Sequence, residues 1–236
     1  MKLEKQSLWE TLAETDKPVI LYGTGSGADK ILDFCAVKDI KVSGIFASGG
    51  FVRGQSFRGF EIKKFSEIQE LYGNGFCILL AFATRMDIVI KKIYELNDMY
   101  ELYVPNFPVF GEQIYFDYDY YLKNREETEQ VYDLLADAES RNVYENAINF
   151  FITGKLEYLT PIESEHEAAL DLLELRDGLH YIDLGAYDGD TIFELLRYLE
   201  TRKIDVKKIT AFEPDIKNFA KLEKNMRENN LLNIYG

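Results

Sequence analysis

Short apolar runs alternate with amphipathic stretches through residues 1–110 of the chain. The segments 18–22 (PVILY) and 76–82 (FCILLAF) are continuous apolar runs, which is typical of strands in the centre of a parallel sheet. The stretches 29–37 and 88–93 instead place apolar residues at helical spacing. Strands that alternate with helices predict βαβ units and a doubly wound parallel sheet in an α/β domain.

Two further strands are predicted in this part of the chain, at 41–46 and at 102–104. Gly49 and Gly50 indicate a turn after the first of them. We expect the following residues, 51–65, to form an irregular excursion.

Residues 111–176 have a different character. Apolar residues at i, i+3, i+4 and i+7 from Val131 predict a helix, and a second helix is predicted from Ser140 to Gly154, where glycine favours a left-handed cap. The segment carries 16 acidic and 5 basic residues, so it holds most of the net charge of −14. We interpret it as an acidic helical connector.

The α/β pattern restarts in residues 177–236. The segments 180–184 (HYIDL) and 209–212 predict strands, and each is followed by a stretch with apolar residues at helical spacing. The final residues, 231–236 (LLNIYG), are expected to enter a third strand. The sequence therefore predicts three parts: 1–110, 111–176 and 177–236.

Composition narrows the class of protein. The 236 residues of the chain are 47% hydrophobic and 29% charged, as in folded globular proteins. The sequence has no uncharged apolar run of about 18 residues, so we expect no membrane span, and its first residues do not have the pattern of a signal peptide. Two cysteines within apolar stretches, Cys35 and Cys77, favour a reducing cytoplasm, and two histidines leave little material for a metal site. The acidic balance, without a basic stripe, disfavours nucleic acid as a partner.

A first glycine turn, 23–28 (GTGSGA), follows the first predicted strand and matches G-x-G-x-x-A. Two interpretations stay open. Gly23, Gly25 and Gly27 form a candidate nucleotide site, or they form the tight turn that any doubly wound domain needs. NAD is disfavoured, because Ala47 stands where the dinucleotide pattern requires an acidic residue for the ribose.

A second glycine turn has different chemistry. Asp183 ends one predicted strand and Glu213 follows the next, so both are expected at one sheet edge with the glycines between them. A crevice with carboxylates and no basic group suits a positively charged ligand without phosphates, and S-adenosylmethionine offers an ammonium, a sulfonium and a ribose. The candidate cofactor-binding residues are Asp183, Gly185, Ala186, Gly189, Asp190 and Glu213.

Simpler roles for two of these residues also stay open. Asp190 or Thr191 can cap the helix that follows the turn, and Glu213 can be a solvated residue at the end of a strand. The length of the strand–DxGAxxG–helix–strand–E pattern favours a binding site over these alternatives.

The motifs at 181–191 (YIDLGAYDGDT) and 211–215 (AFEPD) resemble those of the FkbM family of S-adenosylmethionine-dependent methyltransferases. The stretch 135–159 is similar to the helical region that precedes this domain in longer bacterial members. Residues 1–110 resemble a Rossmann-like module that some members carry, itself similar to the nucleotide-sugar-binding domain of certain sugar acyltransferases. The resemblance implies a partial Rossmann-like methyltransferase domain in 177–236.

The resemblance also implies roles for residues. By the family pattern, Gly185, Ala186 and Gly189 approach the methionine part of the cofactor, Asp183 helps to hold its ammonium, and Glu213 binds the ribose. The implied reaction is methyl transfer, usually to a hydroxyl oxygen, with a small-molecule or glycan-type acceptor.

The chain departs from the family in one respect. The family fold has a seven-stranded sheet, of which residues 177–236 supply two strands and the entry to a third. We therefore expect a truncated form that does not turn over by itself, with the catalytic base beyond residue 236. The strand edge at Ile182 would be exposed and could pair with a second copy, which makes a homo-oligomer a candidate assembly.

Two rival functions remain. Residues 1–110 could serve as a non-catalytic module that binds a nucleotide or a nucleotide-sugar. An NAD-dependent reductase is the third hypothesis, and Ala47 argues against it.

Overall fold

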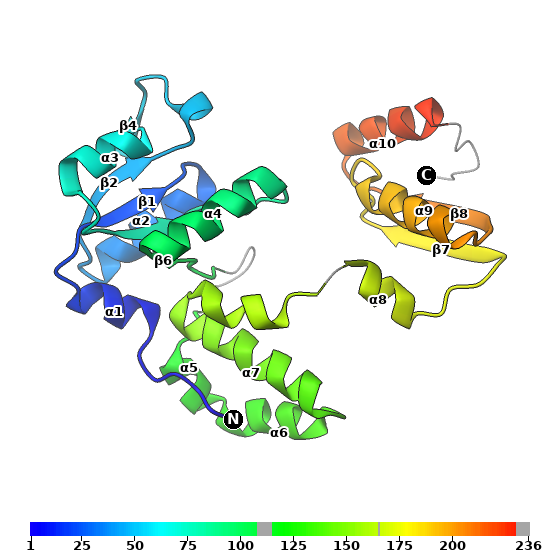
Figure 1. Ribbon diagram of the computed structural model, residues 1–236, viewed down its shortest axis with the longest axis horizontal. Coiled ribbons are helices and arrows are strands. Elements are labelled where there is room, and N and C mark those ends of the chain that lie inside the picture. Colours follow the sequence, from blue (N-terminus) through cyan, green and yellow to red (C-terminus); the bar gives the residue numbers. More distant parts are fainter. Residues whose placement is uncertain (108–114, 165, 230–236) are drawn as a thin grey trace. The chain divides into compact units, whose positions relative to one another are not determined.

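The chain divides into two units, Met1–Glu163 and Ser164–Gly236. The computed structural model (Figure 1) describes residues 1–107, 115–164 and 166–229. Each unit has a sheet and a hydrophobic core of its own.

The first unit is built on a six-stranded sheet with the order β3-β4-β2-β1-β5-β6. All neighbouring strands are parallel except β3 and β4. Every residue of β1 and β5 is buried, which confirms the prediction that these apolar runs are central strands. The strands are β1 (Val19–Tyr22), β2 (Val42–Phe46), β3 (Ser56–Phe57), β4 (Phe60–Lys63), β5 (Cys77–Leu80) and β6 (Glu101–Tyr103).

Helices cover both faces of this sheet (Figure 1). Alternate residues of a strand point to opposite faces, and in β1 Leu21 belongs to a core with Ile31 of α2, while Ile20 belongs to a second core with Ile68 of α3 and Leu96 of α4. The doubly wound α/β arrangement is therefore confirmed. The helices are α1 (Leu8–Glu14), α2 (Ser26–Val37), α3 (Phe65–Tyr72) and α4 (Asp87–Met99).

The prediction of an irregular excursion at 51–65 is wrong. A short 3-10 helix at Gly49–Phe51 leads into the β3–β4 hairpin, and β4 then joins the sheet parallel to β2. Ile62 explains the difference, because its side chain is buried in the core and holds β4 against the sheet.

Among the described residues, three α-helices and two short 3-10 helices follow β6 and belong to the first unit. The main-chain N–H of Val104 donates to the carbonyl of Gly154 (2.7 Å), and the N–H of Glu4 donates to Oδ1 of Asn149 (2.8 Å). Gly154 has φ +67° and ends the last of these α-helices, as predicted. The segment predicted as one connector is thus divided between the two units. The elements are α5 (Tyr118–Lys123), α6 (Arg125–Leu134), α7 (Ala138–Thr153), and 3-10 helices at Leu156–Tyr158 and Thr160–Ile162.

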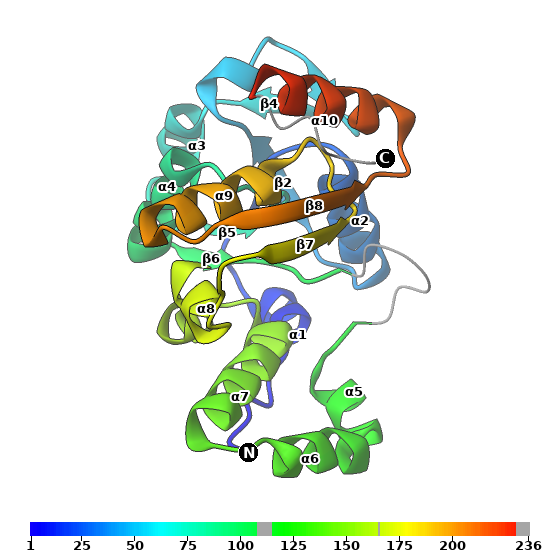
Figure 2. The same cartoon turned by 90° about the vertical axis from the view of Figure 1, so that its right-hand side faces the viewer.

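The described residues of the second unit form two parallel strands and three helices. Strands β7 and β8 lie side by side (Figure 2), and their register places Asp183 opposite Ala211 and Leu184 opposite Phe212. The expected entry into a third strand, at 231–236, lies outside the described residues. The elements are α8 (His166–Leu172), β7 (Leu179–Leu184), α9 (Asp190–Arg202), β8 (Val206–Phe212) and α10 (Ile216–Glu228).

The two faces of the β7–β8 pair differ. Ile192 of α9 and Leu222 of α10 are buried in the core on one face. On the other face Ile182, Leu184 and Phe212 are 61%, 78% and 49% exposed. Within the described part of the chain β7 and β8 pair only with each other, so this unit presents an apolar sheet face, and each of its two strands has an unpaired edge.

No helix among the described residues combines the length and the apolar character that crossing a membrane requires.

Both cysteines lie in the core of the first unit and are unpaired. Burial raises the pKa of the Cys35 thiol to about 12 and that of the Cys77 thiol to about 11, so both are protonated near neutral pH. We expect neither thiol to react with Ellman's reagent at pH 8 in the folded protein, and both to react once guanidinium unfolds it. Rapid labelling of either cysteine in the folded chain would contradict this burial.

Candidate functional site

The turn between β7 and α9 is held against the end of β8 by main-chain hydrogen bonds. The N–H groups of Gly185 and Ala186 both donate to the carbonyl of Phe212 (2.8 and 2.9 Å). Gly185, Gly189 and Tyr187 all have positive φ, at +93°, +94° and +47°. The turn is therefore tightly folded, and the positive φ at positions 185 and 189 explains why both residues are glycine.

The three small residues of the turn have different surroundings. A Cβ at Gly189 would lie 2.6 Å from Cε of Met226, so this glycine permits close packing of α10. Ala186 is fully buried in the core. A Cβ at Gly185 would meet no atom within 4 Å, so Gly185 is the position where the turn borders open space and a ligand can approach the backbone.

Asp183 lies near the end of β7 on the covered face of the sheet, with 9% of its surface exposed. Its Oδ2 is buried and has no hydrogen-bond partner among the described residues. The neighbouring phenol of Tyr181 has a raised pKa, because burial, the negative charge of Asp183 and a hydrogen bond to the Asp183 side chain disfavour its ionised form. A buried carboxylate oxygen without a donor is costly and indicates a cationic or hydrogen-bonding group that the site still lacks.

Glu213 follows β8 and reaches back to the glycine turn. Its Oε2 accepts the N–H of Tyr187 (2.8 Å), and its Oε1 accepts the N–H of Asp215 (2.9 Å). The alternative that Glu213 is a solvated strand end therefore does not describe it, since two main-chain donors fix the carboxylate. Through these bonds and the strand register, the ends of β7 and β8 and the turn form one local structure.

The prediction that Asp190 or Thr191 caps α9 is wrong. The helix begins at Asp190, its N-cap residue is Gly189, and no side chain caps it. Oδ1 of Asp190 accepts the adjacent N–H and hydroxyl of Thr191 (2.9 and 3.3 Å). Because Asp190 already lies inside the helix, its side chain cannot reach the donors two and three residues further on.

Sequence reasoning missed several residues that shape this turn. Nζ of Lys221 lies 5.2 Å from the ring centroid of Tyr187, which places a basic side chain at a turn expected to have none. Asp215 caps α10 by accepting the N–H groups of Lys217 and Asn218 (both 2.9 Å). Only this last contact had a sequence signal, since an aspartate directly before a helical stripe is a preferred N-cap.

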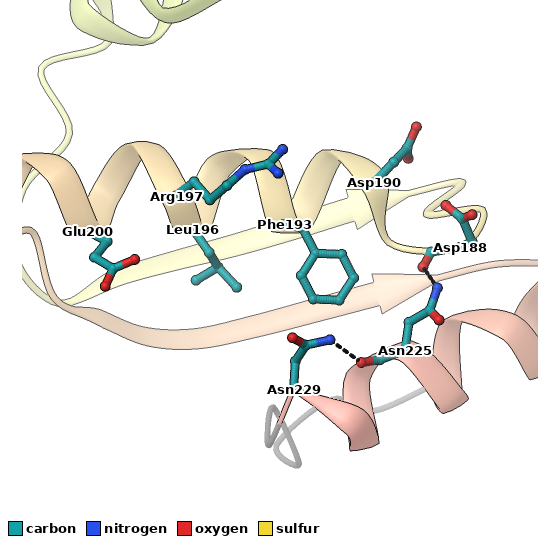
Figure 3. A pocket seen from close by; sticks show the side chains of 8 residues that line it. All are labelled: Asp188, Asp190, Phe193, Leu196, Arg197, Glu200, Asn225 and Asn229. Carbon is teal, nitrogen blue, oxygen red and sulfur yellow. Dashed lines mark hydrogen bonds between the residues drawn. The ribbon is translucent and has the colours of Figure 1, made fainter. Parts of the chain in front are cut away.

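A separate cavity of about 720 Å³ lies along α9 and α10 (Figure 3) and includes neither Asp183 nor Glu213. At its end the side chain of Asn225 donates to the main-chain carbonyl of Asp188 (2.8 Å), and Asn229 donates to the carbonyl of Asn225 (2.8 Å). The first of these contacts fastens α10 to the glycine turn, so we interpret this hollow as the groove between two packed helices.

The first glycine turn connects β1 to α2 in the other unit. A Cβ at Gly27 would lie 2.2 Å from the carbonyl oxygen of Ala81, and a Cβ at Gly23 would lie 2.5 Å from Cδ1 of Phe82. Gly25, with φ +101°, borders open space. Packing alone thus accounts for the glycines at 23 and 27, whereas it leaves Gly25 available to a ligand.

No three histidine, cysteine, aspartate or glutamate side chains gather into a metal site among the described residues.

No protein-family model matches the chain, and no curated protein matches it. A solved structure is similar: the crystal structure described as methyltransferase FkbM from Methylobacillus flagellatus KT, with a TM-score of 0.61 and 17% sequence identity. The similarity covers 96% of this chain and 65% of the other, so the chain spans less than two thirds of that protein. The α/β fold, with its six-stranded sheet and its small parallel sheet, therefore resembles the FkbM methyltransferase fold.

Proposed function

We propose that the Ser164–Gly236 unit binds S-adenosylmethionine and that the chain serves methyl transfer to a hydroxyl oxygen. The observation that carries the proposal is the buried Oδ2 of Asp183, which lacks a hydrogen-bond donor beside a glycine turn. The resemblance of the fold to an FkbM methyltransferase supports the same function.

Asp183 has the properties expected of a group that receives an ammonium. A buried carboxylate oxygen without a hydrogen-bond donor is unfavourable, and a charge-assisted hydrogen bond from a ligand would offset that cost. Gly185 leaves open space next to it, where the methionine part of the cofactor can lie against the backbone.

Glu213 can hold the ribose without giving up its present contacts. Each carboxylate oxygen accepts one main-chain N–H, and each has a further lone pair. Two vicinal ribose hydroxyls can donate to these positions, as they do to acidic residues at the end of the second strand in nucleotide-binding α/β folds.

When bound, S-adenosylmethionine supplies an activated methyl group on a sulfonium. The part of this chain would be to bind and orient it, which can account for much of the acceleration of a displacement reaction. A small-molecule or glycan-type hydroxyl is the acceptor we propose.

Asp183→Asn tests the proposal, because it removes the charge and keeps the shape of the side chain. We expect the unliganded variant to be more stable to urea by about 1 kcal/mol or more, since the variant no longer buries a carboxylate oxygen without a donor. We also expect its affinity for S-adenosylhomocysteine, measured by calorimetry, to fall about 10- to 100-fold, as for loss of one charge-assisted hydrogen bond.

Asp188→Asn is the matched control, because Asp188 lies in the same turn. Among the described residues its main-chain carbonyl accepts a hydrogen bond, and its side chain makes none. This variant should leave the affinity unchanged. An Asp183→Asn variant that binds like the unmodified protein would refute the assignment, and so would one that loses stability without losing affinity.

A further inference from the structure

A second cavity lies in the first unit, at the place where ligands bind in doubly wound sheets. Strand β2 lies on one side of β1 and β5 lies on the other side, so the order in which the chain adds strands to the sheet reverses at β1. Ligands of such folds bind in the crevice beyond the carboxyl ends of the strands at this point. A cavity of about 270 Å³ lies there, lined by residues that end or follow β1, β2 and β5.

The lining of this cavity is aromatic, apolar and hydroxylic, and contains no charged side chain. Oη of Tyr22 and Oγ of Ser48 lie 2.9 Å apart, and the ring of Tyr22 meets that of Phe82 edge to face at 4.9 Å. Phe51 and Met86, which also line it, are 70% and 62% exposed. Large exposed apolar side chains around hydroxyls suit a planar ring that carries hydroxyl groups.

The size of the cavity limits its ligand. Its 270 Å³ lies just below the range for small-molecule pockets, about 300–1,000 Å³. Ala47 lines it where dinucleotide-binding folds place an acidic residue. The cavity therefore fits one nucleoside better than a dinucleotide.

A neighbouring hollow of about 410 Å³ supplies positive charge. It shares Tyr22, Ser48 and Val89 with the first cavity, and Lys91 and Lys92 of α4 line it. Lys92 forms an ion pair with Glu95 (3.2 Å). The two hollows adjoin at the Tyr22–Ser48 hydroxyl pair, so a ligand with its ring in the first can extend an anionic group toward the lysine end of the second.

We propose that the Met1–Glu163 unit binds a nucleoside phosphate, with the base and ribose in the 270 Å³ cavity and the phosphate directed to Lys91 on α4. This site is separate from the carboxylate site of the other unit, and it does not depend on the function proposed there.

The test is a calorimetric titration of the full chain with the four ribonucleoside 5′-monophosphates, the four nucleosides and NAD. At least one monophosphate should bind at one site per chain, more tightly than its nucleoside and more tightly than NAD. Ala83→Trp, which fills the cavity from an exposed lining position, should weaken binding of both nucleotide and nucleoside at least tenfold.

Lys91→Ala should reduce the advantage of the nucleotide over its nucleoside several-fold and lessen the salt dependence of binding, while the nucleoside is unaffected. Lys38→Ala is the control, because Lys38 lies at the C-terminal end of α2. This variant should bind both the nucleotide and the nucleoside like the unmodified chain. Glu213→Ala should leave nucleotide binding intact, which separates this site from that of the second unit.

Absence of saturable binding by any of the nucleotides would overturn the proposal, as would an Ala83→Trp variant with unchanged affinity. Nucleotide binding that is insensitive to Lys91→Ala would refute the placement of the phosphate.

Discussion

A Gly27→Ala variant is expected to lose about 3 kcal/mol or more of stability in the Met1–Glu163 unit. The added Cβ would lie 2.2 Å from the carbonyl oxygen of Ala81. The oxygen that the Cβ would meet belongs to the backbone, so no side chain can move aside. Helix α2 would have to shift away from the end of β5, although its residues Ala28 and Ile31 are buried in the core. Overpacking of this kind typically costs 1–3 kcal/mol, and more where the neighbour is rigid.

Urea unfolding followed by circular dichroism measures this effect. Gly49→Ala is the matched control, because a Cβ there meets nothing within 4 Å and the φ of Gly49 is not positive. It should change the free energy of unfolding by no more than about 0.5 kcal/mol. Equal stability of the two variants would mean that α2 does not pack on β5 as described.

Glu213→Ala should weaken binding of S-adenosylhomocysteine by about 100-fold. Its carboxylate fixes the glycine turn through Tyr187 and the start of α10 through Asp215, and in the proposed function it also accepts the ribose hydroxyls. Hydrogen bonds to a charged group are worth about 1.5–3 kcal/mol each, so loss of the ribose contacts alone accounts for such a change.

Two comparisons make the result specific. Glu213→Gln keeps the shape of the side chain but turns one acceptor into a donor, so we expect an intermediate affinity. Glu223→Ala removes a carboxylate of α10 that forms an ion pair with Arg227, and this variant should bind like the unmodified chain. Full affinity in Glu213→Ala would exclude this residue from the site.

Much of the fold could be predicted because a strand that is buried on both faces of a sheet has a continuous apolar sequence. The runs that form β1 and β5 are continuously apolar, and both proved to be fully buried central strands. Strand β4 was missed because only Ile62 of its four residues is buried and the hairpin before it is short. A prediction from local pattern cannot detect a strand that is held by a single buried side chain and by pairing with β2.

The site shows the same limit. Asp183 could be singled out because it lies near the end of a predicted strand, and Glu213 because it directly follows the next one. The bond from the N–H of Tyr187 to Glu213 could not be predicted, since any residue supplies a main-chain donor. Likewise, the sequence shows a glycine at both 185 and 189, but only the structure distinguishes open space at the first from the packing of Met226 at the second.

The most direct test of the central claim is a crystal structure of the chain with S-adenosylhomocysteine. The account predicts that the ribose hydroxyls donate to Glu213, that the amino group lies within hydrogen-bond distance of Oδ2 of Asp183, and that the ligand contacts the backbone at Gly185. Ligand bound only along α9 and α10, in contact with neither Asp183 nor Glu213, would contradict it.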